Sequence, residues 1–191
     1  MEKNTPGLKF KYDERVVRNL KKAFSQESYV KVGILGGSGA QGSQAYIAGV
    51  HEFGGNPRVT DKMRRFFRAA FGASIRKDTT HIHIPRRSFI RLSLTQKGGE
   101  YTEWIKASRP QIFREIVAGN LFVILTKIGV QWENYIHECF RTSGWGSWPP
   151  ISPITELGRL DDDAKGNGQV TRQPLRRTGA LERSITHEVV L

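Results

Sequence analysis

The stretch that decides the fold is Leu121-Phe-Val-Ile-Leu-Thr-Lys-Ile-Gly-Val-Gln-Trp-Glu-Asn-Tyr-Ile-His-Glu-Cys-Phe140. Its apolar residues recur every three or four positions, at Leu121, Leu125, Ile128, Trp132, Tyr135 and Cys139. This spacing places them on one side of an α-helix. We therefore predict one long amphipathic helix over 121–140, whose apolar stripe packs against the rest of the chain.

Alternating apolar and polar residues on either side of this helix predict short β-strands. The clearest strand is Ser28–Leu35, where Val30, Val32 and Ile34 share one face, and β-branched residues suit a pleated surface. The same alternation predicts strands at 8–12 and 80–84, and a final strand is expected at 185–190. Pro85 ends the strand at 80–84 because it cannot donate a hydrogen bond to a sheet ladder.

Further helices are predicted from caps and helical spacing. Asp13 is expected to cap a helix with the stripe Val17, Leu20 and Phe24, and Thr60 begins a basic helix that buries Met63, Phe66, Phe67 and Ala70. A short helix over 43–53 carries Tyr46, Ile47, Val50 and Phe53, and one helical turn is expected at 179–184. Residues 100–118 are also predicted as helical, with Pro110 kinking the segment or opening a second helix.

These elements favour an α+β fold over a doubly wound parallel sheet, because the strands are few and the insertions between them irregular. We expect a single domain over 1–191, in which a small sheet packs against the long helix and loops and arms project. The segments 36–43 and 156–173 are poor in apolar residues, so burial within one subunit cannot offset their ordering entropy. We predict that both are mobile in the isolated subunit and ordered in an assembly, which hydrogen exchange on a verified monomer tests.

The charge of the chain predicts attraction to polyanions. Thirty Lys and Arg residues against eighteen Asp and Glu give a net charge of +12 and a pI near 10.1, which indicate nucleic acid or acidic protein surfaces as partners. Simple solubility is the alternative explanation. The N-terminus lacks the apolar core of a signal peptide and no apolar run is long enough to span a bilayer, so we expect a soluble chain made in the cytoplasm.

Several motifs suggest chemistry but lack the context that it needs. The sequence Gly37-Ser-Gly-Ala-Gln-Gly42 matches a dinucleotide-binding turn, yet no further βαβ units follow, so a flexible tip is the preferred interpretation. His81 and His83 can face one metal ion from a strand, but no third ligand has a recognisable spacing. No serine lies in a nucleophile elbow, and the single Cys139 excludes an intramolecular disulfide and is expected to be a buried thiol. We therefore predict no catalytic, cofactor-binding or metal-binding residue.

Two other groups suggest contacts with partners. Two arginine clusters contain interleaved phenylalanines, and their arginines offer contacts to phosphates. Helical spacing directs Phe66 and Phe67 to the interior. The cluster members are Arg64, Arg65, Arg68, Arg86, Arg87 and Arg91. Trp145 and Trp148 lie among prolines and glycines. They are either exposed anchors for a partner or side chains folded back over their own core.

Five blocks of sequence follow one another along the chain. They are Tyr46-Ile-Ala-Gly-Val-His-Glu-Phe-Gly54, Val59-Thr-Asp-Lys-Met-Arg-Arg-Phe-Phe67, Ile84-Pro-Arg-Arg-Ser-Phe89, Trp148-Pro-Pro-Ile-Ser-Pro-Ile-Thr155 and Pro174-Leu-Arg-Arg-Thr-Gly-Ala-Leu-Glu-Arg-Ser-Ile185. In order and rough spacing, over about residues 46–185, the series resembles the tail-completion, or virion morphogenesis, family of tailed bacteriophages, including its Mu-like members. The family's third block typically reads I-P-A-R-P-F, so Arg86 and Ser88 depart from it while Arg87 and Phe89 match.

The resemblance implies an α+β structural protein of the virion, not an enzyme. Such a protein sits in the neck as a head–tail connector, completing the tail or joining it to the head, and the resemblance implies a hexameric ring of identical copies. Its implied partners are neighbouring neck and tail proteins, with non-specific contact to DNA in the channel as a further contact and no membrane. The alternative function is a basic nucleic-acid-binding accessory protein, whose affinity for duplex DNA falls steeply with salt.

Overall fold

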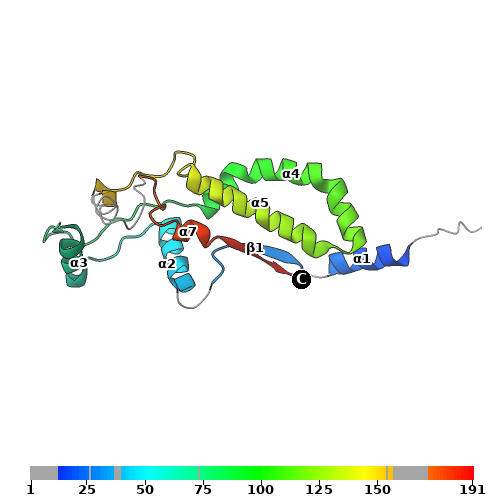
Figure 1. Ribbon diagram of the computed structural model, residues 1–191, viewed down its shortest axis with the longest axis horizontal. Helices are drawn as coiled ribbons and strands as arrows, with labels where there is room; N and C mark the ends of the chain where they lie inside the picture. Colours follow the sequence, from blue (N-terminus) through cyan, green and yellow to red (C-terminus); the bar gives the residue numbers. More distant parts are fainter. Residues whose placement is uncertain (1–12, 26, 37–39, 73, 154, 157–171) are drawn as a thin grey trace, which may run out of the picture.

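The computed structural model describes residues 13–25, 27–36, 40–72, 74–153, 155–156 and 172–191 (Figure 1). The predicted strand over 8–12, the centre of the glycine-rich turn and nearly all of the predicted mobile loop at 156–173 lie outside these residues. Within them the fold is α+β, with a small antiparallel sheet and long helices. None of the described helices is long and apolar enough to cross a membrane.

The body of the molecule is an antiparallel pair of helices, α4 (Ile90–Ala118) and α5 (Leu121–Arg141). The chain reverses at Gly119, whose φ of 89° lies in the left-handed region that glycine adopts without steric cost. Its N–H closes the last turn of α4 by donating to the carbonyls of Glu115 and Ile116. Figure 1 shows α4 arching over α5 before the chain turns back.

Pro110 neither ends α4 nor opens a second helix. The helix begins at Ile90, ten residues earlier than the predicted segment, and continues through Pro110 to Ala118. The alternative in which Pro110 opens a second helix is therefore wrong. An aromatic contact joins the two long helices: the ring centroid of Tyr101 on α4 lies 4.8 Å from that of Trp132 on α5. Packing of this kind supplies the tertiary contacts that let a long helix tolerate one proline.

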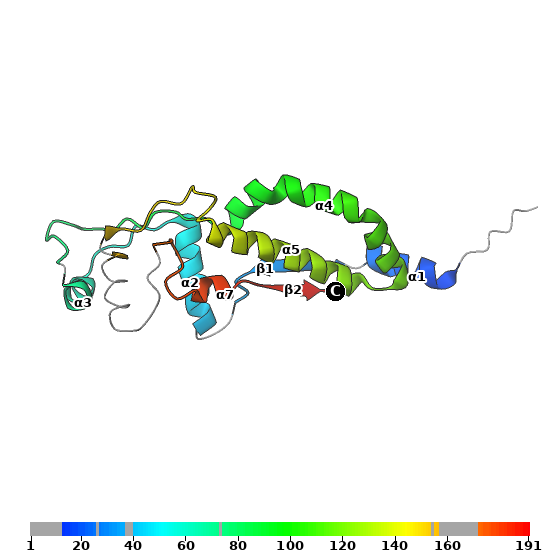
Figure 2. The same cartoon turned by 45° about the horizontal axis from the view of Figure 1, so that its top comes forward.

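The sheet has two strands, β1 (Tyr29–Gly33) and β2 (Thr186–Val190), which pair antiparallel although the sequence separates them widely. Val30 lies opposite Val189 and Val32 opposite His187. The alternating exposure of β1 confirms the predicted face of Val30 and Val32. Figure 2 shows both strands lying along α5, so the predicted packing of a small sheet on the long helix is confirmed.

The predicted stripe of α5 is only part of what the helix buries. Tyr135 and Cys139 are buried as expected, but so are Ile124, Ile136 and Phe140. They are buried because α5 has α4 on one side and the sheet on another, so more than one stripe faces protein. The single apolar stripe therefore located the helix correctly, but it predicted fewer buried residues than the helix has.

Helix α1 (Glu14–Ser25) begins as predicted, since the Asp13 carboxylate accepts the N–H of Arg15 at 2.8 Å. It lies beside the end of α4, where the Asn19 amide donates to a backbone carbonyl of that helix at 2.8 Å. The helix buries no residue, and Phe24 is 81% exposed. The predicted burial of Phe24 was therefore wrong.

Helix α2 (Ala40–Phe53) also presents a different face from the predicted one. Its inner side is formed by Ala48 and Glu52, which are 7% and 6% exposed, whereas Tyr46 and Phe53 are 75% and 70% exposed. The small Ala48 belongs to the hydrophobic core together with Phe89. The aromatic side chains point outward because this close contact uses the small side of the helix.

The segment between α2 and α4 forms an arm, defined as residues 56–83, whose tip is α3 (Asp61–Phe71). Figure 1 shows α3 at one end of the molecule and α1 at the other. The Thr60 hydroxyl accepts the N–H of Met63, which confirms the predicted cap. The predicted burial of Phe66 was wrong, since this side chain is 58% exposed.

In place of the strand predicted at 80–84, the structure has two extended segments, one on each side of α3, which we call the stem of the arm. The chain on either side of α3 runs antiparallel, with isolated bridges between Gly55 and Ile84 and between Arg58 and His81. Pro57 has no N–H to donate, so a continuous ladder cannot form between these bridges. The alternation at 80–84 therefore predicted extended backbone correctly, but this segment makes isolated bridges and not a strand.

The hydrophobic core lies where the start of α4, the end of α5, α2 and the C-terminal turn α7 (Ala180–Arg183) meet. Its buried members are Ala48, Phe89, Ile136, Cys139, Phe140, Trp148, Leu181 and Ile185. The predicted one-turn helix near 179–184 and the final strand are both confirmed.

Candidate functional site

The Glu52 carboxylate joins the end of α2 to the beginning of α4. It accepts the Ser88 hydroxyl at 2.6 Å and the backbone N–H groups of Phe89, Ile90 and Arg91 at 2.9, 3.1 and 3.0 Å. The Nε of Arg91 donates to it as well, at 3.2 Å. The first N–H groups of a helix lack intrahelical partners and carry partial positive charge, so a buried carboxylate suits this place.

The hydrogen bonds also set the charge state of Glu52. Burial raises the pKa of its carboxyl, but the bonds from Ser88 and from the N–H groups of Arg91, Ile90 and Phe89 lower it by more. The net pKa lies below its ordinary value, so Glu52 is an anion at neutral pH. The sequence analysis gave this carboxylate no structural role, although Glu52 lies in the first of the five blocks.

Arg87 and Trp148 tie the same turn to the proline-rich loop. Arg87 donates from Nε to the carbonyl of Pro149 at 2.9 Å and from a terminal nitrogen to that of Pro150 at 2.6 Å. Trp148 donates from Nε1 to the carbonyl of Ser88 at 2.9 Å. The two side chains thereby satisfy three backbone carbonyls that no helix or strand uses.

The structure therefore brings four of the five sequence blocks into one junction. The first contributes Glu52, the third the turn through Arg87, the fourth Trp148, and the last Leu181, which is buried in the same core. The second block lies apart, in the arm on α3. We call the meeting point the motif junction.

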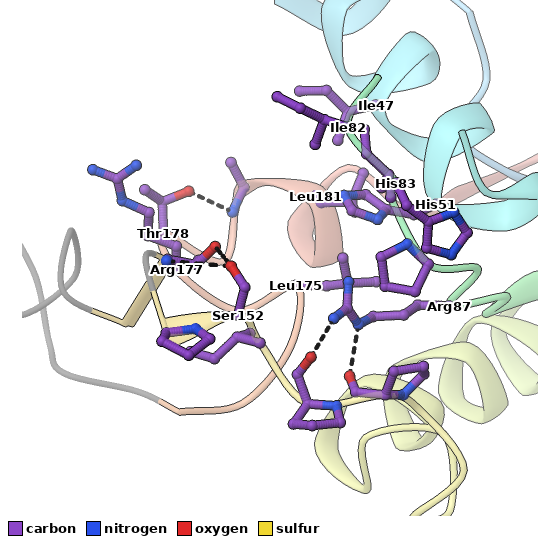
Figure 3. A pocket seen from close by; sticks show the side chains of 18 of the residues that line it. Ile47, His51, Ile82, His83, Arg87, Ser152, Leu175, Arg177, Thr178 and Leu181 are labelled. Carbon is purple, nitrogen blue, oxygen red and sulfur yellow. Dashed lines mark hydrogen bonds between the residues drawn. The ribbon is translucent and has the colours of Figure 1, made fainter. Parts of the chain in front are cut away.

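A cavity of about 950 Å³ opens beside the motif junction (Figure 3). Its walls come from α2, from Phe67 of α3, from the chain entering α4, from the proline-rich loop and from the segment before and within α7. Most of the lining is apolar: Ile47, Phe67, Ile82, Ile84, Pro85, Pro149, Pro150, Ile151, Pro153, Leu175, Ala180 and Leu181. Figure 3 shows His51 and His83 at one wall and Ser152 at another.

The polar groups of the cavity do not form an acid–base pair. Among the described residues that line it there is no aspartate, glutamate, lysine or cysteine. The Ser152 hydroxyl lies 2.8 Å from that of Thr155, and the structure gives it no histidine partner. Burial and the nearby charge of Arg87 lower the pKa of His51, so this imidazole is neutral at pH 7. The polar part of the lining thus includes two histidines, two arginines and the hydroxyls of Ser152, Thr155 and Thr178.

The motifs set aside in the sequence show no site in the described part of the chain. Gly37 and Gly39 lie outside the described residues. His81 contacts the hydroxyl of Thr80 at 3.1 Å, and no group of three or more His, Cys, Asp or Glu side chains among the described residues is placed to hold a metal ion. Burial raises the pKa of the Cys139 thiol to about 12, which confirms the predicted buried thiol.

The two tryptophans fold back on their own chain. Trp148 is 7% exposed and belongs to the core, and Trp145 packs against it. The Nε1 of Trp145 donates to Glu138 at 3.2 Å. The alternative that both are exposed anchors for a partner is therefore wrong.

Most of the six clustered arginines serve the fold. Arg64 donates to four carbonyls in the loop after α3, Arg68 to the hydroxyl of Ser74, and Arg91 to Glu52. Arg87 clamps the proline-rich loop. The sequence pattern did not separate these internal donors from the exposed cations, because both have the same spacing.

Sequence reasoning missed two exposed apolar surfaces. The first, the α2 patch, consists of Tyr46, Ile47 and Phe53. The second, the α5 patch, lies on the outer side of the first turns of α5 and consists of Phe122, Val123 and Val130. Figures 1 and 2 both place α2 near the C-terminal end of α5 and the α5 patch's turns at the opposite end, near α1. The patches are therefore separate surfaces.

Comparison of the chain with protein-family models, with curated proteins and with solved structures gave no match.

Proposed function

We propose that the protein is a structural component of a bacteriophage virion that completes the tail, or joins it to the head, by assembling into a ring. The proposal rests on the ordered sequence blocks and on the two separate apolar patches. The blocks supply the resemblance, and the patches supply a physical means of assembly.

The patches are the observation that carries the proposal. A cyclic ring uses a heterologous interface, in which one surface of a subunit contacts a different surface of the next. Single exposed apolar residues are ordinary, but α2 turns Tyr46 and Phe53 outward while burying a carboxylate and an alanine. Burying the outer side of such a helix against another chain removes apolar surface from water and so stabilises the assembly. The α5 patch supplies a second surface, at a distance from the first.

The proposed activity is assembly without catalysis. The cavity beside the motif junction has mostly apolar walls, with two histidines and two arginines among its polar residues, and its described lining lacks a carboxylate. This composition favours docking of an apolar side chain from a neighbouring neck or tail protein. The virion neck is accordingly the proposed location of the protein.

Purified protein tests ring formation directly. Mass photometry over a range of concentrations should show a closed oligomer, with six copies expected from the resemblance. Replacing Tyr46 and Phe53 together by serine should give monomers, because it removes the aromatic part of the α2 patch. Phe24→Ser is the matched control, since Phe24 is equally exposed but lies on α1. A wild-type protein that stays monomeric at every concentration would contradict assembly through its own copies.

Deletion of the gene in the phage tests the proposed place in the virion. The expected lysate contains finished heads and tails that fail to join, or tails of faulty length. Normal infectious particles from the deletion would refute the proposal.

The second candidate is a nucleic-acid-binding accessory protein, and the charge of the arm favours it. The segment 56–83 carries seven Lys or Arg residues and two acidic residues. This function predicts tight, salt-sensitive complexes between the isolated monomer and duplex DNA. Tight complexes of duplex DNA with the isolated monomer would favour this second function over ring assembly.

A further inference from the structure

The arm carries a concentration of positive charge that the fold does not neutralise. Its seven cationic residues are Arg58, Lys62, Arg64, Arg65, Arg68, Arg76 and Lys77, against the acidic Asp61 and Asp78. In the described part of the chain none of the seven has an ion pair. Figure 1 shows α3, the tip of the arm, at the end of the molecule farthest from α1.

Two of these cations, Arg64 and Arg68, make hydrogen bonds that shape the arm, and Arg68 donates from Nε to the hydroxyl of Ser74 at 3.3 Å. The guanidinium of Arg64 donates to the carbonyls of Ile75, Arg76, Lys77 and Thr79, at 3.1, 2.7, 3.3 and 2.7 Å. These bonds hold the loop after α3 against the helix. Carbonyl acceptors are neutral, so the charge of Arg64 persists and adds to the local positive field.

The remaining exposed cations of the arm lie on its stem, on α3 and on the loop that Arg64 holds against α3. We call them the arm cations: Arg58, Lys62, Arg65, Arg76 and Lys77, all of which are exposed. The bonds from Arg64 thus join helix and loop into one unit, which carries four of the five arm cations: Lys62, Arg65, Arg76 and Lys77.

We infer that the arm binds the phosphate backbone of duplex DNA, without base recognition, through the arm cations. Duplex DNA presents one negative charge for about every 1.7 Å of its axis, so several cations find phosphates in many registers. An acidic protein surface must instead match the cations position by position. Binding by the arm does not depend on ring assembly, since the arm cations belong to neither apolar patch.

The test is fluorescence anisotropy of a labelled duplex of random sequence titrated with the full-length protein. If about four cations contact phosphates, the slope of log affinity against log salt is about −3.6, which is a loss of about 100-fold between about 50 and about 200 mM KCl. Replacing all five arm cations by glutamine should flatten the slope to less than about 1 in magnitude and weaken binding at low salt by about 100-fold or more.

A matched control removes the same net charge from the other end of the molecule. It replaces by glutamine five exposed cations of α1 and α4, namely Arg18, Lys21, Lys22, Arg109 and Arg114. This variant should retain the wild-type slope and bind within about threefold of wild type. Equal losses in both variants would overturn the inference, because net charge and not the arm would then cause binding.

Folding is checked by circular dichroism, and a smaller variant keeps the test decisive. Arg76→Gln with Lys77→Gln changes only the loop, and should reduce the magnitude of the salt slope by about 1.8. An unchanged slope in a folded arm variant would refute the contact. Poly-glutamate that competes as strongly as duplex DNA would also overturn the inference, in favour of an acidic protein partner. Mass photometry of the same variants shows assembly separately, so loss of DNA binding with intact rings is the expected combination.

Discussion

Replacing Glu52 by glutamine tests whether the motif junction stabilises the fold. The amide keeps one oxygen, so its NH₂ group takes the place of the carboxylate oxygen that now accepts the N–H groups of Phe89 and Ile90 at 2.9 and 3.1 Å. Each donor left without an acceptor costs about 1 kcal/mol at the low end of the usual range. Loss of the negative charge at the start of α4 adds about 1 kcal/mol. We therefore expect Glu52→Gln to lower the free energy of unfolding by about 3 kcal/mol.

Urea denaturation at pH 7, followed by circular dichroism and tryptophan fluorescence, measures this change. With a slope of about 2 kcal/mol per molar urea, the midpoint should fall by about 1.5 M. Glu103→Gln is the control: Glu103 is 72% exposed and, among the described residues, its ion pair is with Lys106 on the surface, so the expected loss is under about 0.5 kcal/mol. A Glu52→Gln midpoint equal to that of the control would refute the reasoning.

The same pair of proteins predicts a pH dependence. Because the pKa of Glu52 is lowered in the folded state, its stabilisation is present above the unfolded pKa and is lost as pH falls through the folded value. The difference between wild type and Glu52→Gln should therefore narrow below about pH 4.5, the ordinary value for this carboxyl. A constant difference from pH 7 to pH 3 would contradict the assigned charge.

Three further predictions concern packing. Gly129→Ala places a Cβ 2.5 Å from the His187 ring and should destabilise the protein by about 1–3 kcal/mol in urea. In the control Gly98→Ala the added Cβ meets nothing within 4 Å, so this change should stabilise α4 by about 0.5–1 kcal/mol. Equal urea midpoints for the two variants would contradict the packing of α5 on β2. The buried Cys139 should resist a thiol reagent at pH 8 in native protein and react at once in urea, and rapid native reaction would refute its burial. Trp148→Phe removes the hydrogen bond to a buried carbonyl and should cost about 1–2 kcal/mol in a thermal melt, and an unchanged melt would show that the bond adds nothing.

The arm shows why part of the interaction surface was predictable from sequence and part was not. Thr60 marked the start of α3, and the positive charge of 56–83 is a property of composition. Which arginines remain exposed depends on the loop carbonyls that fold back to Arg64. The spacing of basic residues carries no information about such acceptors.

The sequence by itself determined the elements with strong local signals. Helical spacing located α5, alternation located β1, and the side chains of Asp13 and Thr60 marked where two helices begin. These signals depend on neighbours within a few residues, so a linear pattern contains them.

Only the tertiary structure decided which faces are buried and where distant segments meet. Glu52 caps a helix that begins 38 residues later, and Trp148 donates to Ser88 across 60 residues. Tyr46 and Phe53 point outward because contact with the core uses the small side of α2, an arrangement that hydrophobicity alone predicted in reverse. Burial depends on what packs against each residue, and in this chain those partners come from segments far apart in the sequence.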